Sequence, residues 1–227
     1  MNAPMNVSEA VASRRSVRGF LPTPVDPAVI RRLVEQAARA PSGGNLQPWH
    51  IDVVGGARLD ELKAIMAKTT QENPRGEPTE YDIYPKELPS PYRDHRFAVG
   101  EDLYGALGIP REDKFARLMW FARNFQFFGA PVGLFCSVQR TMGPPQWSDL
   151  GMYLQTLMLL LREEGLDSCA QECWAIYPQT IGRFLNLPEG RMLFCGMSIG
   201  HADMADNANQ WQSRRAPPAD FARFHGL

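Results

Sequence analysis

Three arginines surround a serine near the beginning of the chain, where Arg14, Arg15, Ser16 and Arg18 fall within residues 14–18. Guanidinium groups bind phosphate oxygens through paired hydrogen bonds, and a serine hydroxyl adds a further donor. This spacing therefore predicts a site for a phosphate monoester dianion. A solvated basic turn would have the same composition, so both interpretations stay open on these residues alone.

A second polar cluster, PSGGNLQPW at residues 41–49, lies between an expected helix and an expected strand. Gly43 and Gly44 lack a Cβ atom, so the backbone there can approach a flat ligand closely. Ser42 and Asn45 supply hydrogen-bond donors and acceptors. The cluster favours a loop that contacts a ligand, although a plain helix-to-strand turn with a structural tryptophan is the alternative.

Other site patterns are absent or incomplete in the sequence. It contains no G-x-G-x-x-G, no G-x4-G-K-[ST] and no H-E-x-x-H, so a Rossmann site, a P-loop and a zincin helix are unsupported. The cysteines at positions 136, 169, 173 and 195 have neither zinc nor redox-motif spacing, and the four histidines are isolated. We therefore expect buried free thiols and no metal.

The charge balance limits the partners of the protein. Lysine and arginine number 24 against 25 acidic residues, a net charge of −1. A general nucleic-acid binder needs a positive surplus, so we expect no nucleic-acid partner. The longest apolar run, residues 157–161, is far too short to span a bilayer, and the N-terminal residues lack a signal-peptide pattern. We therefore expect a cytoplasmic protein without a membrane partner.

The two polar clusters need elements to position them, and hydrophobic periodicity predicts those elements. Helices are expected from Pro27, over residues 115–128, from Ser148 to Gly165 and over 178–185; strands are expected near residues 51–54, 131–138, 166–173 and 192–199. Helices and strands mix without a strict βαβ rhythm, which predicts an α+β fold in a single domain over residues 1–227. Residues 70–114 contain six prolines. They predict a long loop with short helical pieces, of the kind that often covers an active site.

Taken together, the two polar clusters resemble the nitroreductase family of flavin enzymes. The resemblance continues in residues 165–172 (GLDSCAQE), in residues 195–203 (CGMSIGHAD), and in Asn209 followed by residues 214–217 (RRAP). It thus covers nearly the whole chain. Residues 84–85, 91–92, 96–97, 103–105, 109–111 and 128–131 further resemble the branch of the family that contains 4-nitrobenzoate-type reductases.

The resemblance implies a three-layer fold with a mostly antiparallel sheet flanked by helices. It also implies an intertwined homodimer in which the C-terminal residues 204–227 extend onto the partner subunit. One flavin mononucleotide (FMN) would lie in each of two interface sites. Its phosphate and ring edge would contact Arg14, Arg15, Ser16, Arg18, Arg214 and Arg215; its other contacts would come from Gln171 and Glu172 and from the second subunit's copies of Pro41, Ser42, Gly43 and Asn45. Glu172 would help to position the flavin, and Cys173 stands where many members have glycine.

The implied activity is electron transfer from NADH or NADPH, through flavin N5, to a small aromatic acceptor of the nitroaromatic or quinone type, with ping-pong kinetics. No side chain would act as a catalytic group. The alternatives are a reductive dehalogenase or ene-reductase on the same scaffold, or a non-catalytic flavin-binding protein. Tyr92, within residues 70–114, is the expected contact for the acceptor. Those residues could instead serve interface packing.

Overall fold

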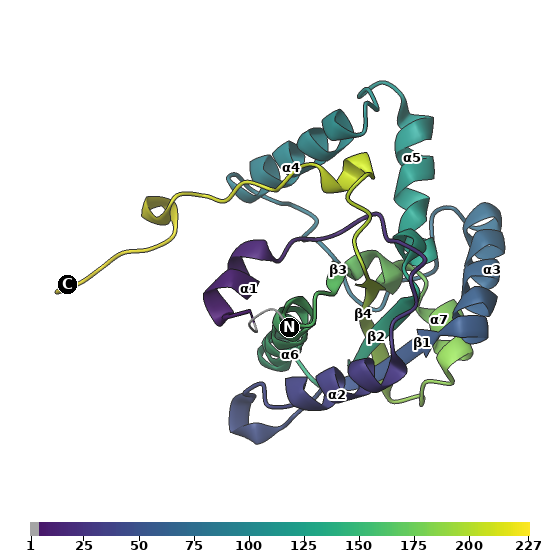
Figure 1. Ribbon diagram of the computed structural model, residues 1–227, viewed down its shortest axis with the longest axis horizontal. Coiled ribbons are helices and arrows are strands. Elements are labelled where there is room, and N and C mark those ends of the chain that lie inside the picture. Colours follow the sequence, from purple (N-terminus) through teal and green to yellow (C-terminus); the bar gives the residue numbers. More distant parts are fainter. Residues whose placement is uncertain (1–4) are drawn as a thin grey trace.

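An antiparallel sheet forms the centre of the molecule in the computed structural model, which describes residues 5–227 (Figure 1). The first four residues of the predicted domain 1–227 lie outside the described part. Within that part, the sheet has four strands in the order β1-β2-β4-β3; these are β1 (His50–Gly55), β2 (Val132–Gln139), β3 (Asp167–Gln171) and β4 (Arg191–Gly200). The two central strands are apolar over most of their length because both of their faces are buried.

Helices cover both faces of the sheet, so the molecule has three layers (Figure 1). Successive residues of β2 enter opposite cores: Leu134 packs on one side and Phe135 on the other. The first core includes residues of α2 (Pro27–Ala37) and α6 (Pro144–Glu163), and α1 (Val7–Ser13) packs against α6. The second core includes residues of α3 (Gly56–Glu72) and α7 (Pro178–Leu185), together with short 3-10 turns at Arg123–Gly129 and Glu172–Ile176. The predicted α+β class and layered arrangement are confirmed.

The helix boundaries follow from local chemistry. Asp26 caps α2, because its carboxylate accepts the Ala28 N–H at 2.8 Å, and Pro27 occupies the first helical position. The expectation that α6 begins at Ser148 was wrong by four residues, since the helix starts at Pro144. Proline fits the first turn of a helix, where its missing N–H has no intrahelical partner.

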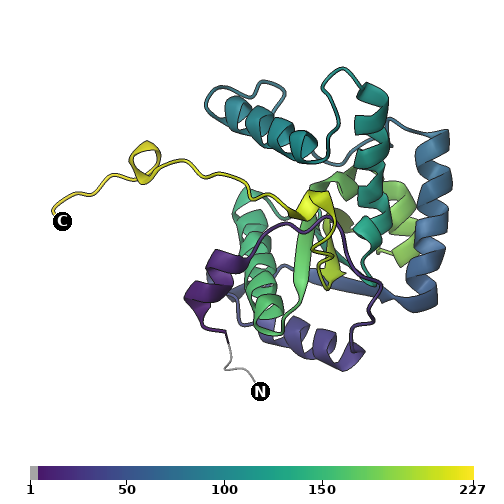
Figure 2. The same ribbon diagram turned by 45° about the horizontal axis from the view of Figure 1, so that its top comes forward.

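The prediction of a long loop with short helical pieces over residues 70–114 was wrong for Tyr92–Ala106, which form one continuous helix, whereas residues 73–91 and 107–113 lie outside helices and strands. The helix α3 continues to Glu72, α4 covers Tyr92–Ala106, and α5 (Lys114–Ala122) follows. Proline is absent between Tyr92 and Ala106, so nothing in the sequence interrupts a helix there. Only Leu103 of α4 is buried, so this helix needs no apolar stripe and none marked it in the sequence. In Figure 2, α4 and α5 stand together above the body of the molecule.

Residues 73–81, at the beginning of this region, are hydrogen-bonded to the body of the molecule. The Glu77 carboxylate accepts the backbone N–H of Gln179 at 2.7 Å and that of Thr180 at 3.1 Å, at the start of α7. The Tyr177 hydroxyl donates to the Asn73 carbonyl at 2.8 Å. The Tyr81 hydroxyl donates to the carbonyl of Phe194 in β4. Residues 73–81 are therefore held in place, whereas α4 contributes only one buried residue.

Two further expectations concern the cysteines and the membrane. All four cysteines are free thiols, and Cys136, Cys169 and Cys195 are buried, as expected. Cys173 is only partly buried. Among the described residues, the helices include none that combines the length and the apolar character needed to cross a membrane.

Candidate active site

The arginine-rich residues 14–18 run in extended conformation beside the edge strand β3. Ser16 forms a parallel bridge with Ser168, and the Val17 N–H donates to the Ser168 carbonyl at 3.0 Å. Val17 is fully buried in the second core, which anchors the segment. In an extended chain, alternate side chains face opposite sides, so Arg14, Ser16 and Arg18 share one side. We call residues 14–18 the arginine segment.

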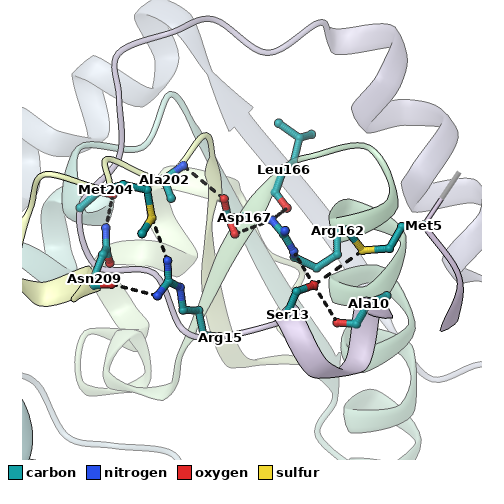
Figure 3. A network of polar contacts seen from close by, with 11 residues as sticks. Met5, Ala10, Ser13, Arg15, Arg162, Leu166, Asp167, Ala202, Met204 and Asn209 are labelled. Carbon is teal, nitrogen blue, oxygen red and sulfur yellow. Dashed lines mark hydrogen bonds and ion pairs between the residues drawn. The ribbon is translucent and has the colours of Figure 1, made fainter. Parts of the chain in front are cut away.

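Asn209 ties the arginine segment to the C-terminal residues. Its side chain is 1% exposed. Its Oδ1 accepts the Arg18 N–H at 2.8 Å, and its Nδ2 donates to the carbonyls of Gly19 at 2.8 Å and Asp203 at 2.9 Å. The backbone carbonyl of Asn209 accepts from Arg15 at 2.9 Å (Figure 3). The sequence resemblance included Asn209 but did not assign it this role.

Arg14 and Arg215 come together from opposite ends of the sequence. The pKa of Arg14 is lowered, first by burial and then by the positive charge of Arg215. Within residues 5–227, neither guanidinium forms an ion pair with a carboxylate. Positive charges without a carboxylate partner favour the binding of an anion, since a bound anion relieves their repulsion.

The other two predicted arginines point elsewhere. Arg15 is engaged by the Asn209 carbonyl and by the Met204 sulfur, which lies 2.8 Å from its guanidinium (Figure 3). Arg214 bonds both carboxylate oxygens of Asp102 on α4, at 3.0 and 3.1 Å. Of the six residues predicted to contact the flavin phosphate and ring edge, Arg15 and Arg214 are therefore held by residues distant in sequence. Arg215 instead donates to its neighbours Ser213 and Arg214, and Arg18 to the Ser16 carbonyl.

The end of β3 supplies the residues expected near the flavin ring. Gln171 is 2% exposed; its amide donates to the Asn124 carbonyl at 2.8 Å and accepts from Ser198 at 2.7 Å. The Gln171 side chain therefore has its hydrogen-bond partners inside the protein, and only the Gln171 backbone could contact a ligand. Glu172 follows as an exposed residue, and partial desolvation raises the pKa of its carboxyl. Burial also raises the pKa of Cys173, which disfavours its thiolate form.

A hydrolase-like spacing in β4 has a structural explanation. Gly196 to Gly200 follows the pattern G-x-S-x-G, in which serine is the nucleophile of many hydrolases. Ser198 is 0% exposed within the central strand, and its hydroxyl donates to Gln171. A buried serine without a base beside it cannot attack a substrate. The chain therefore has no nucleophile at this motif.

The 41–47 loop has a defined backbone shape. Gly44, Asn45 and Gln47 have φ values of 58°, 57° and 50°, in the left-handed region. The Ser42 hydroxyl accepts the Gln47 N–H at 3.0 Å and so closes the loop on itself. The Gly43 N–H donates to Asp149 of α6 at 3.2 Å. The loop is thus pre-shaped, with Pro41 and Asn45 on its exposed surface.

The 41–47 loop and the arginine segment lie at opposite ends of α6. The loop contacts Asp149 near the start of the helix, whereas Arg162 near its end contacts Ser13, next to the arginine segment, at 3.3 Å (Figure 3). At 1.5 Å per residue, these two helix positions are about 20 Å apart. One chain therefore does not bring the two predicted halves of the site together.

Tyr92, the expected contact for the acceptor, and the two nearby tyrosines at positions 81 and 84 lie in different surroundings. Tyr92 lies at the start of α4 with 62% of its surface exposed. Tyr84 is also exposed, and the Arg96 guanidinium lies 4.0 Å from its ring centre. Tyr81 instead points inward, 5.4 Å from the Trp147 ring. As for metals, residues 5–227 contain no group of three or more His, Cys, Asp or Glu that could hold an ion.

Comparison with known proteins places this geometry in a family. The model of the nitroreductase family matches residues 11–201. The 4-nitrobenzoate reductase of Pseudomonas putida is 37% identical over 96% of this chain and 94% of its own length. The nitrobenzene nitroreductase of Ectopseudomonas oleovorans is 33% identical over 96% of both chains.

Two solved structures are similar throughout. The FMN and NADPH-dependent nitroreductase NfnB from Sphigopyxis sp. strain HMH has a TM-score of 0.95 and 48% identity, over 98% of this chain and 100% of that one. The FMN-dependent nitroreductase NfnB from Mycobacterium smegmatis, in complex with NADPH, has a TM-score of 0.91 and 31% identity, over 96% of this chain and 97% of that one. The resemblance to the 4-nitrobenzoate reductase branch is confirmed by the first relative. The chain belongs to the nitroreductase family of oxidoreductase enzymes.

Proposed function

We propose that the protein is an FMN-dependent nitroreductase that accepts electrons from NADH or NADPH and passes them to nitroaromatic or quinone-like acceptors. The fixed arginine segment carries this proposal: β3 and Asn209 hold its backbone in place, and the positive charge of Arg215 acts on Arg14 from the other end of the chain. The names of the similar proteins support the cofactor, the electron donor and the nitroaromatic class.

The residues present fit FMN. Arg14 and Arg215 would hold the phosphate, and the Ser16 hydroxyl would add a donor. Arg18, on the same side of the segment, would place positive charge by the ring, where it stabilises an electron-rich flavin. The backbone at Glu172 would face the ring edge. When bound, FMN supplies the chemistry of accepting a hydride and returning it to an acceptor. The residues of the protein would bind FMN, orient its ring and shield it from solvent.

The active unit is proposed to be a homodimer of single-domain subunits with two shared sites. The 41–47 loop of one subunit would complete the site that begins at the arginine segment of the other, because one chain holds them about 20 Å apart along α6. Within the C-terminal residues 204–227, the residues after Arg214, which is bonded to Asp102 of α4, leave the body as an extended arm (Figure 1). Phe221 and Phe224 on this arm are each 73% exposed, as expected for side chains that pack on a partner subunit.

An absorption spectrum of the purified protein tests the cofactor. A yellow protein that releases FMN on denaturation is expected. A colourless protein that rejects added FMN would contradict the proposal. Steady-state kinetics then test the reaction order: donor and acceptor that use the same cavity in turn give parallel double-reciprocal lines. Lines that intersect in the absence of product would exclude a shared cavity.

Tyr92 is the proposed contact for the acceptor, because it is exposed at the start of the helix above the body. Replacing Tyr92 by alanine should change the ratio of kcat/KM values between two acceptors by about fivefold, the effect of about 1 kcal/mol. FMN retention should not change. Tyr84→Ala is the matched control. Loss of flavin with an unchanged acceptor preference would remove Tyr92 from the acceptor pocket.

A further inference from the structure

A buried hydrogen-bond network surrounds the side chain of Gln171 at the end of β3. This side chain is 2% exposed, and its amide uses both donor hydrogens and both acceptor positions. The Nε2 donates to the backbone carbonyl of Asn124 at 2.8 Å and to the Asn124 Oδ1 at 3.1 Å. The Oε1 accepts the Ser198 hydroxyl at 2.7 Å and the Trp174 Nε1–H at 3.3 Å. Because an indole N–H can only donate and a carbonyl can only accept, these partners fix the orientation of the amide.

The network joins separate elements around the backbone that would face the flavin. Ser198 belongs to β4, Trp174 to the 3-10 turn that follows β3, and Asn124 to the 3-10 turn that follows α5. Glu172 comes directly after Gln171 in the chain, so a displacement of the Gln171 backbone would move Glu172 with it. The side chain of Gln171 therefore holds the end of β3 against three neighbouring elements.

The packing around Trp174 makes this network rigid. Trp174 is fully buried, and its ring centre lies 4.6 Å from that of Phe127 and 5.1 Å from that of Phe135. A Cβ atom on Gly196, which pairs with Gln171 across the sheet, would collide with the Trp174 ring. Phe127 keeps a φ of 51°, which is costly for a bulky side chain and persists only where the surroundings enforce it. A side chain bonded to such fixed partners can hold a backbone in one position.

We propose that Gln171 is a positioning residue for the flavin ring. Its side chain fixes the backbone at Glu172, and that backbone meets the ring edge of FMN. The role is indirect, because a side chain enclosed in this way cannot touch a ligand itself. The inference rests on the proposed function, which places the flavin ring at Glu172.

Gln171→Glu tests this role because the new side chain has nearly the same shape and two protonation states. A neutral carboxyl can donate its O–H to the Asn124 carbonyl as the amide does, whereas a carboxylate places an acceptor against that carbonyl. Burial raises the pKa of a carboxyl group, so the neutral form is favoured at low pH. Glu172 and Cys173 also have a pKa raised by burial, and the charge of Arg18 acts on Cys173. Each measurement is therefore compared with the wild type at the same pH.

The dissociation constant for FMN, measured by fluorescence quenching, should be within about threefold of the wild-type value at about pH 5.5. At about pH 8.5 it should be at least about tenfold higher, because the carboxylate repels the Asn124 carbonyl and displaces the backbone at Glu172. The absorption spectrum of the bound flavin should depart from that of the wild type at the higher pH only. Thermal unfolding of the flavin-free variant establishes that it is folded at both pH values. A role in the fold alone would lower the unfolding temperature and leave the affinity and the flavin spectrum of the folded protein unchanged.

Gln71→Glu is the matched control, because it makes the same change at an exposed position of α3. It should leave the dissociation constant within about twofold of the wild type at both pH values. Ser198→Ala is a second variant with a smaller change. Ser198 is 0% exposed and cannot reach the flavin, so a rise of about threefold in the dissociation constant would be transmitted by Gln171.

If both Gln171→Glu and Ser198→Ala fold and bind FMN with wild-type affinity and a wild-type flavin spectrum, the inference is overturned. A wild-type protein that does not bind FMN contradicts the proposed function itself, and that outcome is separate.

Discussion

The two halves of the flavin site differ in how much of each is complete within one chain. The backbone of the arginine segment is held within one chain: β3 bridges it at Ser16, and Asn209 connects it to the C-terminal residues. The 41–47 loop has three residues with left-handed angles above a carboxylate oxygen with no partner. The difference fits the proposal that the arginine half forms when the chain folds, whereas the loop half would be completed by flavin and a second chain. Substitutions in the two halves should therefore give different signatures.

The largest effect is expected for Asn209→Ala, which should lower the free energy of unfolding by about 3 kcal/mol. The Arg18 N–H and the carbonyls of Gly19 and Asp203 would lose their partners, and unsatisfied buried polar groups cost about 1–3 kcal/mol each. Urea unfolding measures the change. Asn207→Ala, at an exposed position nearby, is the control and should have little effect. A loss below about 1 kcal/mol would mean that the arginine segment does not depend on Asn209.

Arg215→Ala should weaken FMN binding about 30-fold with little change in stability. A hydrogen bond to a charged group contributes about 1.5–3 kcal/mol, and here the anion would also lose the cation that faces Arg14. The adjacent Arg214→Ala is the control, because Arg214 is turned toward Asp102. It should change the affinity by about twofold or less. Equal losses in the two variants would contradict the assignment of the anion site to Arg14 and Arg215.

In the 41–47 loop, substitutions that disfavour the left-handed backbone angles should lower the affinity for FMN. Gly44→Ala should destabilise the loop by about 1 kcal/mol, because φ is 58° at Gly44 and an added Cβ meets no atom within 4 Å. The expected result is an FMN affinity reduced by about fivefold. Gly151→Ala is the control: it also has open space, but it lies within α6, where alanine is favoured. Gly151→Ala should raise stability slightly and leave FMN binding unchanged.

Sequence patterns predicted the arginine segment and the α+β layers because these depend on local residue types and periodicity. The strands β2 and β4 are apolar on both faces, and Asp26 with Pro27 marks the start of α2. The directions of Arg15 and Arg214 could not be predicted, since they depend on Met204 and Asp102, which are distant in sequence. The burial of Asp149 could not be predicted for the same reason. Asp149 lies on an otherwise apolar face of α6, and the distant 41–47 loop covers it.

The smallest expected effect is on the ion pair between Arg214 and Asp102, which connects the C-terminal residues to α4. Arg214 joins the C-terminal arm to α4 through Asp102, and 78% of its side chain is exposed. Exposed ion pairs contribute about 0.2–1 kcal/mol, so a double-mutant cycle of Asp102→Asn and Arg214→Gln should give a coupling of about 0.5 kcal/mol or less in the flavin-free protein. FMN bound at the neighbouring Arg215 would order the arm, so the coupling should increase in the holoprotein. An identical coupling in both forms would mean that α4 is independent of the phosphate end. In that case Tyr92, on the same helix, would select acceptors without sensing the flavin.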